Sequence, residues 1–136
     1  MSNIETIESH YRAGARGDLD AMLAPLAKDV RWTEAEGFPY AGTYIGPDDI
    51  VTNVFSRLES EWDEFRVTID DLIDGGDVIV GVGTYSGTYR RTGQSTQARV
   101  AHIWRFSGDQ VSSFEQITDT ERIRRAMRDA DSATNC

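Results

Sequence analysis

A histidine in an apolar strand is the first candidate for chemistry in this chain. Residues 100–106 alternate as a strand does, so that side chains two positions apart lie on the same face. The residues that share this face with His102 are Val100, Trp104 and Phe106. A polar group on an apolar sheet surface is typical of a small-molecule pocket. The alternative is a core histidine whose ring is satisfied by hydrogen bonds.

The next predicted strand repeats this pattern. After a short turn at 107–109, residues 111–118 place Phe114, Gln116 and Thr118 on one face. Glutamine and threonine do not exchange protons near neutral pH, so they can orient a substrate or a water but cannot act as acid or base.

A carboxylate beside an indole is the second candidate. Glu34 follows Trp32 by two positions in the alternating segment 30–34, so both side chains point to the same side. If the indole removes water from the carboxylate, its pKa rises towards a range useful for proton abstraction. The alternative is an exposed glutamate at a strand end.

Helices are predicted before most of the strands. Apolar residues recur at helical spacing over 4–11, and the pattern stops near 14–17. Asp18 can cap a second short helix with apolar residues over 19–26. A third helix begins at 46–49, with proline at its first position, and its apolar face reaches Val54, Phe55, Leu58 and Trp62.

The second half reads as a meander of antiparallel strands. Strands are predicted over 65–69, 78–82, 100–106 and 111–118, with turns at 74–77, 91–94 and 107–109. The glycines at 81, 83 and 87 indicate bending or a close backbone approach. A capping-box pattern at 118–121 starts a terminal helix, with Asp119 as a candidate N-cap. This order predicts an α+β fold in which helices cover one face of a curved sheet.

Length and charge narrow the class of protein. The 136 residues suit a single domain over 1–136, and a net charge of −9 with scattered arginines argues against nucleic acid and anionic membranes. No apolar run approaches a membrane span, and no signal peptide is recognisable, so we expect a cytoplasmic protein. The single cysteine, Cys136, excludes an internal disulfide and lies in a tail, after Asp131, that we expect to be frayed. Two histidines and this cysteine cannot form a nitrogen–sulfur metal site. A carboxylate metal site stays open, but no calcium-loop or HExxH pattern is present, and we expect no metal and no cofactor.

Several short motifs follow one another along the chain. They are Tyr11 with 17–20, then 29–32, 42–46, 75–80, 102–106 and 116–120. Their order and spacing resemble the nuclear transport factor 2-like superfamily, and within it the SnoaL-like and ketosteroid-isomerase-like branch. The resemblance implies a cone-shaped barrel in which a curved, mostly antiparallel sheet wraps around the N-terminal helices. It also implies a pocket on the concave face and a homodimer through the outer face. This fold hosts enzymes and binding modules alike.

The resemblance also suggests roles for single residues. Glu34 falls where ketosteroid-isomerase-like enzymes carry their general base, and His102 where they carry an acid in the oxyanion hole. Gln116 departs from SnoaL-like cyclases, which place an acid at this point. Tyr11 or His10 lies near the isomerases' phenol donor, but we expect Tyr11 to pack in the core and His10 to be solvated.

The pocket walls are expected to be aromatic. The candidates for ligand contact are Trp32, Tyr40, Tyr44, Phe55, Trp104, Phe114, Gln116 and Thr118. Such walls suit a flat, apolar, carbonyl-bearing molecule. Three interpretations follow: a cofactor-independent isomerase or cyclase that abstracts a proton next to a carbonyl, with Glu34 as base and His102 as donor; a non-catalytic binding module; and a scaffold whose cavity is filled by aromatic side chains.

Overall fold

Most of the helices precede most of the strands, as the hydrophobic pattern predicts. The computed structural model describes residues 1–128. Its elements are α1 (Asn3–Ala15), α2 (Leu19–Leu23), β1 (Leu26–Glu34), β2 (Gly42–Ile45), α3 (Pro47–Ile50), the π-helical turn η1 (Val51–Phe55), α4 (Ser56–Glu61), β3 (Trp62–Asp74), β4 (Val78–Tyr89), β5 (Ser95–Ser107), β6 (Gln110–Thr118) and α5 (Thr120–Met127). The tail after Asp131 and Cys136 lie outside the described residues.

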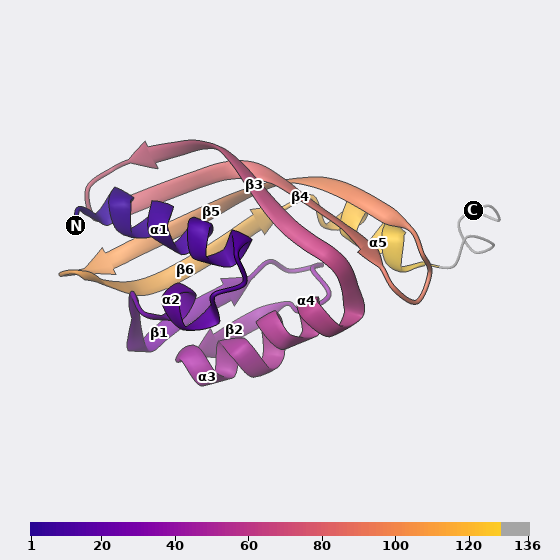
Figure 1. Ribbon diagram of the computed structural model, residues 1–136, viewed down its shortest axis with the longest axis horizontal. Helices are drawn as coiled ribbons and strands as arrows, with labels where there is room; N and C mark the ends of the chain where they lie inside the picture. Colours follow the sequence, from indigo (N-terminus) through magenta and orange to yellow (C-terminus); the bar gives the residue numbers. More distant parts are fainter. Residues whose placement is uncertain (129–136) are drawn as a thin grey trace.

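The strands form one curved sheet with the order β2-β1-β6-β5-β4-β3. Neighbours pair antiparallel except β1 and β6, which are parallel. Figure 1 shows α1 lying across the face of the sheet, with α2, α3 and α4 beside it. This confirms the expected α+β fold, a mostly antiparallel sheet curved around N-terminal helices. The sheet is unclosed, because β2 and β3 remain its free edges.

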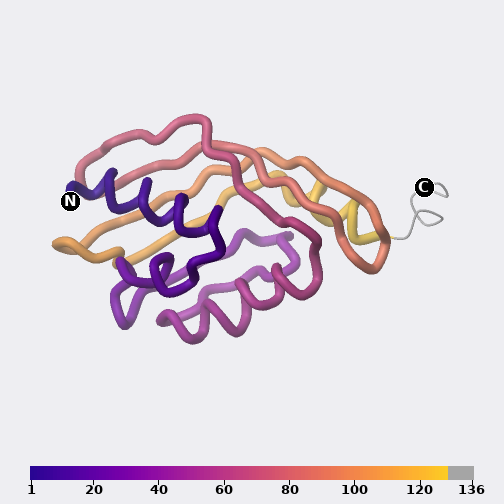
Figure 2. The backbone as a smooth tube through the Cα atoms, viewed as in Figure 1, coloured from indigo at the N-terminus to yellow at the C-terminus, as the bar shows by residue number. Residues whose placement is uncertain are grey.

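Close backbone approach explains the glycines of β4. A Cβ atom at Gly83 would lie 2.1 Å from the Thr68 carbonyl oxygen, and one at Gly81 would lie 2.7 Å from the Tyr11 hydroxyl. Register shifts between β3 and β4, one of them between Ile69 and Asp71, add local twist. Figure 2 shows the resulting bend of β3 along its length. The predicted close approach is therefore confirmed.

Three predicted boundaries were wrong. Leu26 begins β1 instead of ending the second helix, because Pro25 interrupts the helix. The carbonyl oxygen of Pro25 accepts a hydrogen bond from the Val111 N–H instead. Residues 42–45, for which no strand was predicted, form β2 by pairing with β1. Trp62 begins β3, and the preceding helix contains a π-helical turn.

A bulge corrects the predicted facing of Val111. The pairing of β5 with β6 shifts register between Arg105 and Phe106, so Val111 lies opposite Phe106. Both side chains then point into the core, and Val111 is fully buried. Strict alternation from Phe114 and Gln116 predicts Val111 on the outer face, because alternation alone does not anticipate a bulge.

No helix in the described part of the chain is long and apolar enough to span a membrane. Nor do residues 1–128 contain a cluster of three or more His, Cys, Asp or Glu residues arranged to hold a metal ion.

Asp119 caps the terminal helix α5. Its Oδ1 accepts a hydrogen bond from the backbone N–H of Arg122 at 3.3 Å. Thr118, the first residue of the expected capping box, instead donates to the carbonyl oxygen of Arg99. The helix therefore starts one residue later than the capping-box pattern implies.

The cap predicts a stability difference between two substitutions. We expect Asp119→Ala to lower the free energy of unfolding by about 1 kcal/mol, because a first-turn N–H loses its acceptor. Asp119→Asn keeps an acceptor oxygen and should change stability little. Urea denaturation measures both. An equal loss in the two variants would contradict the capping role and assign the effect to the ion pair with Arg122.

Candidate functional site

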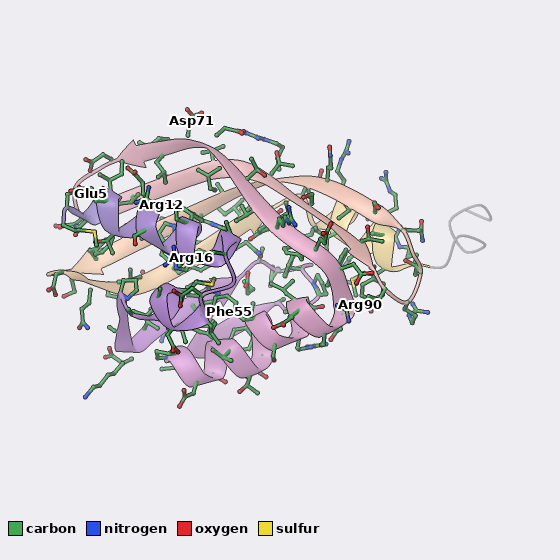
Figure 3. All side chains as sticks on the ribbon, viewed as in Figure 1. Glu5, Arg12, Arg16, Phe55, Asp71 and Arg90 are labelled. Carbon is green, nitrogen blue, oxygen red and sulfur yellow. The ribbon has the colours of Figure 1, made fainter. Side chains whose placement is uncertain are left out.

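A cavity of about 630 Å³ lies between the helices and the concave face of the sheet. Its walls come from α1, β1, η1, α4 and the long strands β3 to β6. Figure 3 labels Phe55 on the helical segment beside α2, and Phe55 forms part of the cavity wall. A cavity of this volume argues against the scaffold interpretation, in which aromatic side chains fill the space.

Most of the predicted site residues come together in this cavity. Those that line it are Glu34, His102, Trp32, Phe55, Trp104, Phe114 and Gln116. Trp32 lies opposite Phe114 in the β1–β6 register, and their rings stack with centroids 3.8 Å apart. Strand alternation and the parallel pairing of β1 with β6 thus bring the two halves of the predicted site to one wall.

Three predicted contact residues do not line the cavity. Tyr40 is buried in a second core cluster, where its hydroxyl donates to Glu61. Tyr44 stands on the edge strand β2 and donates to the carbonyl oxygen of Tyr40. Thr118 lies at the end of β6, where its hydroxyl is turned to the backbone of β5. Aromatic type and strand facing do not show where along a strand the cavity ends.

Glu34 is a buried carboxyl with one unpaired oxygen. The residue is 4% exposed, and Oε1 accepts a hydrogen bond from Trp32 Nε1 at 3.2 Å. Oε2 has no hydrogen-bond partner among residues 1–128. Burial raises the pKa of Glu34 to about 8, and the Trp32 hydrogen bond opposes part of this rise. The alternative of an exposed strand-end glutamate is wrong.

His102 lies between two phenols. Its Nδ1 is 2.8 Å from the Tyr11 hydroxyl, and its Nε2 is 2.6 Å from the Tyr85 hydroxyl. Burial lowers the pKa of His102 to about 3, with a smaller contribution from His10, so the ring is neutral near pH 7. The two alternatives for His102 are both partly right, because the ring is satisfied by hydrogen bonds and also lines the cavity.

Each of the two phenols beside His102 accepts a further hydrogen bond, so that Trp104 and Gln116 are the outermost residues of the network. Trp104 Nε1 donates to the Tyr11 hydroxyl at 3.0 Å, and Gln116 Nε2 donates to the Tyr85 hydroxyl at 2.9 Å. The Gln116 amide has a fixed orientation, because its Oε1 accepts from the backbone N–H of Ala35. An ionised acid at this position would supply no donor to the Tyr85 hydroxyl.

Three cavity residues were not predicted for their observed roles. His10, expected in solvent, is buried with Nδ1 3.0 Å from the carbonyl oxygen of Met22, and burial lowers its pKa to about 4. Tyr11 packs against the core as expected, but its hydroxyl also reaches His102. Tyr85 was not singled out. The alternation of β4 could have identified Tyr85, because it places the side chain on the same face as Gly81 and Gly83.

The site combines a carboxyl poised near neutrality with a chain of uncharged donors. Burial also raises the pKa of both phenols, and the nearby Glu34 carboxylate adds to the rise at Tyr85. Near pH 7 the imidazoles and phenols are therefore uncharged. Such a wall suits proton transfer to and from a neutral ligand.

The chain is similar to a known protein family and to several solved structures. The family model for the SnoaL-like domain matches residues 7–114. An NTF2-like protein from Burkholderia thailandensis E264 is 48% identical, with 94% of this chain and 98% of that chain covered and a TM-score of 0.92. An NTF2-like protein of unknown function from Burkholderia pseudomallei K96243 is 34% identical, with coverages of 93% and 98% and a TM-score of 0.84.

A third solved structure is TerC, co-crystallised with polyporic acid. It is 25% identical, with 92% of this chain and 97% of that chain covered and a TM-score of 0.83. None of the curated proteins matches significantly. The long family match, the fold and the two Burkholderia relatives agree with one another: the chain belongs to the SnoaL-like domain family of the nuclear transport factor 2-like superfamily.

Proposed function

We propose that this protein is a cofactor-independent enzyme that abstracts a proton from carbon next to a carbonyl group, giving isomerisation or cyclisation. The observation that carries the proposal is the unpaired Glu34 carboxyl oxygen in the cavity wall. A buried carboxyl whose pKa is about 8 is a stronger base, once ionised, than an exposed one.

The proposed step needs an acceptor and a donor in the same cavity. The Glu34 carboxylate takes the C–H proton, and the electron pair of that bond moves to the carbonyl oxygen to form an enolate. The hydrogen-bond network centred on His102 stabilises the negative charge on that oxygen. The neutral state of His102 keeps the donors uncharged, so that the developing enolate is the only new charge on the donor side.

The cavity walls support a flat, apolar ligand that bears a carbonyl group. Trp32, Phe55, Trp104 and Phe114 supply aromatic surface around the Glu34 carboxyl. TerC, which was co-crystallised with polyporic acid, supports a small organic ligand for this fold. The identity of that ligand is not carried over to this chain.

A non-catalytic binding module is the second candidate. It is favoured by Gln116, which occupies a place where SnoaL-like cyclases carry an acid, and by the protonated state of Glu34 below pH 8. A protonated Glu34 would donate a hydrogen bond to a ligand and would remove no proton.

Hydrogen–deuterium exchange separates the two candidates. In D₂O with a panel of cyclic and aryl ketones, we expect the protein to accelerate the exchange of the ketone α-protons. Proton NMR measures the loss of the α-proton signal. Glu34→Gln removes the base and keeps the size, so exchange should fall by roughly 10²-fold or more while ketone affinity changes little. His102→Ala should weaken both. Glu36→Gln, an exposed neighbour, is the matched control. Ketone binding without exchange in the unsubstituted protein would establish the binding module instead.

The exchange rate should also depend on pH in one direction. Only the carboxylate form of Glu34 accepts a proton, and its pKa is about 8. The rate should therefore rise about tenfold per pH unit below that value and level off above it. A rate that levels off near pH 4 to 5 would assign the base to an exposed carboxylate.

The outer face of the sheet supports a homodimer. Ile73 of β3 lies opposite Val80 of β4, and Val80 lies opposite Ile103 of β5. One step along the same strands, Ala101 of β5 lies opposite Ile117 of β6, which is 52% exposed. These apolar side chains share the outer face with Glu115, which lies opposite Ile103. Exposed apolar side chains that gather on one face are typical of a protein–protein interface.

The homodimer gives a test in solution. We expect light scattering to report twice the monomer mass at micromolar concentration. Ile117→Asp should shift the protein towards monomer, because it places a charge in the middle of the apolar face. Leu19→Asp is the matched control, since Leu19 is also an exposed apolar residue but lies on α2, on the helical side of the sheet. A monomer at this concentration in the unsubstituted protein would refute the dimer.

A further inference from the structure

The direction of each terminal hydrogen bond in the cavity network is fixed by chemistry. An indole N–H can only donate, so the Tyr11 oxygen accepts from Trp104. The Gln116 amide is held with its nitrogen towards Tyr85, so the Tyr85 oxygen also accepts. Each phenol oxygen therefore already receives one hydrogen bond from outside the pair.

A neutral imidazole between two such phenols leaves one phenol proton free. The neutral ring of His102 has one N–H and one lone pair, so it donates to one phenol and accepts from the other. If Nδ1 carries the proton, Tyr85 donates to Nε2 and the Tyr11 O–H is free. If Nε2 carries the proton, Tyr11 donates to Nδ1 and the Tyr85 O–H is free. The position of one proton on the ring thus selects the free phenol.

We propose that Tyr11, His102 and Tyr85 form a proton relay, in which the tautomer of His102 selects the phenol that donates to the oxygen of a neutral, carbonyl-bearing ligand. Under this proposal a tyrosine is the group that touches the ligand, and His102 is a positioning residue. The ring itself cannot donate to a ligand in this arrangement, because both nitrogens are engaged.

Proton transfer along the relay balances without leaving a charge. When the free Tyr11 O–H gives its proton to a ligand oxygen, the Nδ1 proton moves to the Tyr11 oxygen and the Tyr85 proton moves to Nε2. Tyr85 then takes a proton from a neighbouring acid. Under the proposal this proton is the one that Glu34, which lines the same cavity, removed from carbon. This use of the relay in turnover rests on the proposed function.

The backbone makes room for one end of the relay. Gly81 lies opposite His102 in the β4–β5 register, and a Cβ atom there would lie 2.7 Å from the Tyr11 hydroxyl. A side chain at this position would push the phenol away from the ring. Glycine at 81 therefore leaves room for the Tyr11–His102 hydrogen bond as it stands.

Nitrogen NMR of the imidazole rings tests the relay without any substrate. In ¹⁵N-labelled protein we expect His102 to carry a single ring proton between pH 5 and 8. Tyr85→Phe should place this proton on Nδ1, because an N–H that faces phenylalanine would lose its acceptor. Tyr11→Phe should place it on Nε2 for the same reason. Gly81→Ala, which keeps both phenols, should have the same effect as Tyr11→Phe.

The controls separate the relay from the proposed reaction. Tyr44→Phe removes a phenol outside the cavity and should leave the His102 ring unchanged. The same tautomer in the Tyr11 and Tyr85 variants, or two ring protons at neutral pH, would overturn the relay. Opposite tautomers in a protein that exchanges no α-protons would support the relay and refute the proposed reaction, so the two can fail independently.

Discussion

Glu34 ends its strand with one carboxyl oxygen held by Trp32 and the other without a partner in the described chain. A buried polar atom that lacks a hydrogen bond destabilises a fold, so such atoms are rare and are concentrated at functional sites. The other polar groups around it are satisfied internally, from Trp104 through the phenols and His102 to Gln116. The free Glu34 oxygen is thus the hydrogen-bond acceptor in this group that remains for a ligand.

Strand pairing and sheet curvature together bring this carboxyl and the His102 network to one cavity. Parallel pairing of β1 with β6 places Trp32 against Phe114, and β5 then carries His102 beside Gln116. The bends of the long strands keep these side chains on a concave face. Helix α1 covers that face and carries Tyr11, whose hydroxyl lies in the space that a side chain at residue 81 would occupy.

Local pattern was sufficient for the parts of this arrangement that depend on periodicity. Alternation along strands placed His102, Gln116 and Glu34 on inner faces, and the cap at Asp119 and the turn glycines marked the element ends. Local pattern did not predict the contacts between segments that are distant in the sequence. The β2 pairing, the bulge that buries Val111, the burial of His10 and the approach of Tyr85 to His102 all depend on register and on helix placement. Single-strand periodicity does not encode these quantities.

The pKa of the Glu34 carboxyl distinguishes a desolvated base in the cavity from an ordinary solvated acid. A ¹³C NMR titration of the Glu34 side-chain carboxyl, identified by its absence in Glu34→Gln, measures that state directly. The structure predicts a midpoint near pH 8, because burial opposes ionisation and only one oxygen has a donor. A midpoint near the ordinary value of 4.5 would show that the carboxyl is solvated, and would contradict the account of the cavity given above.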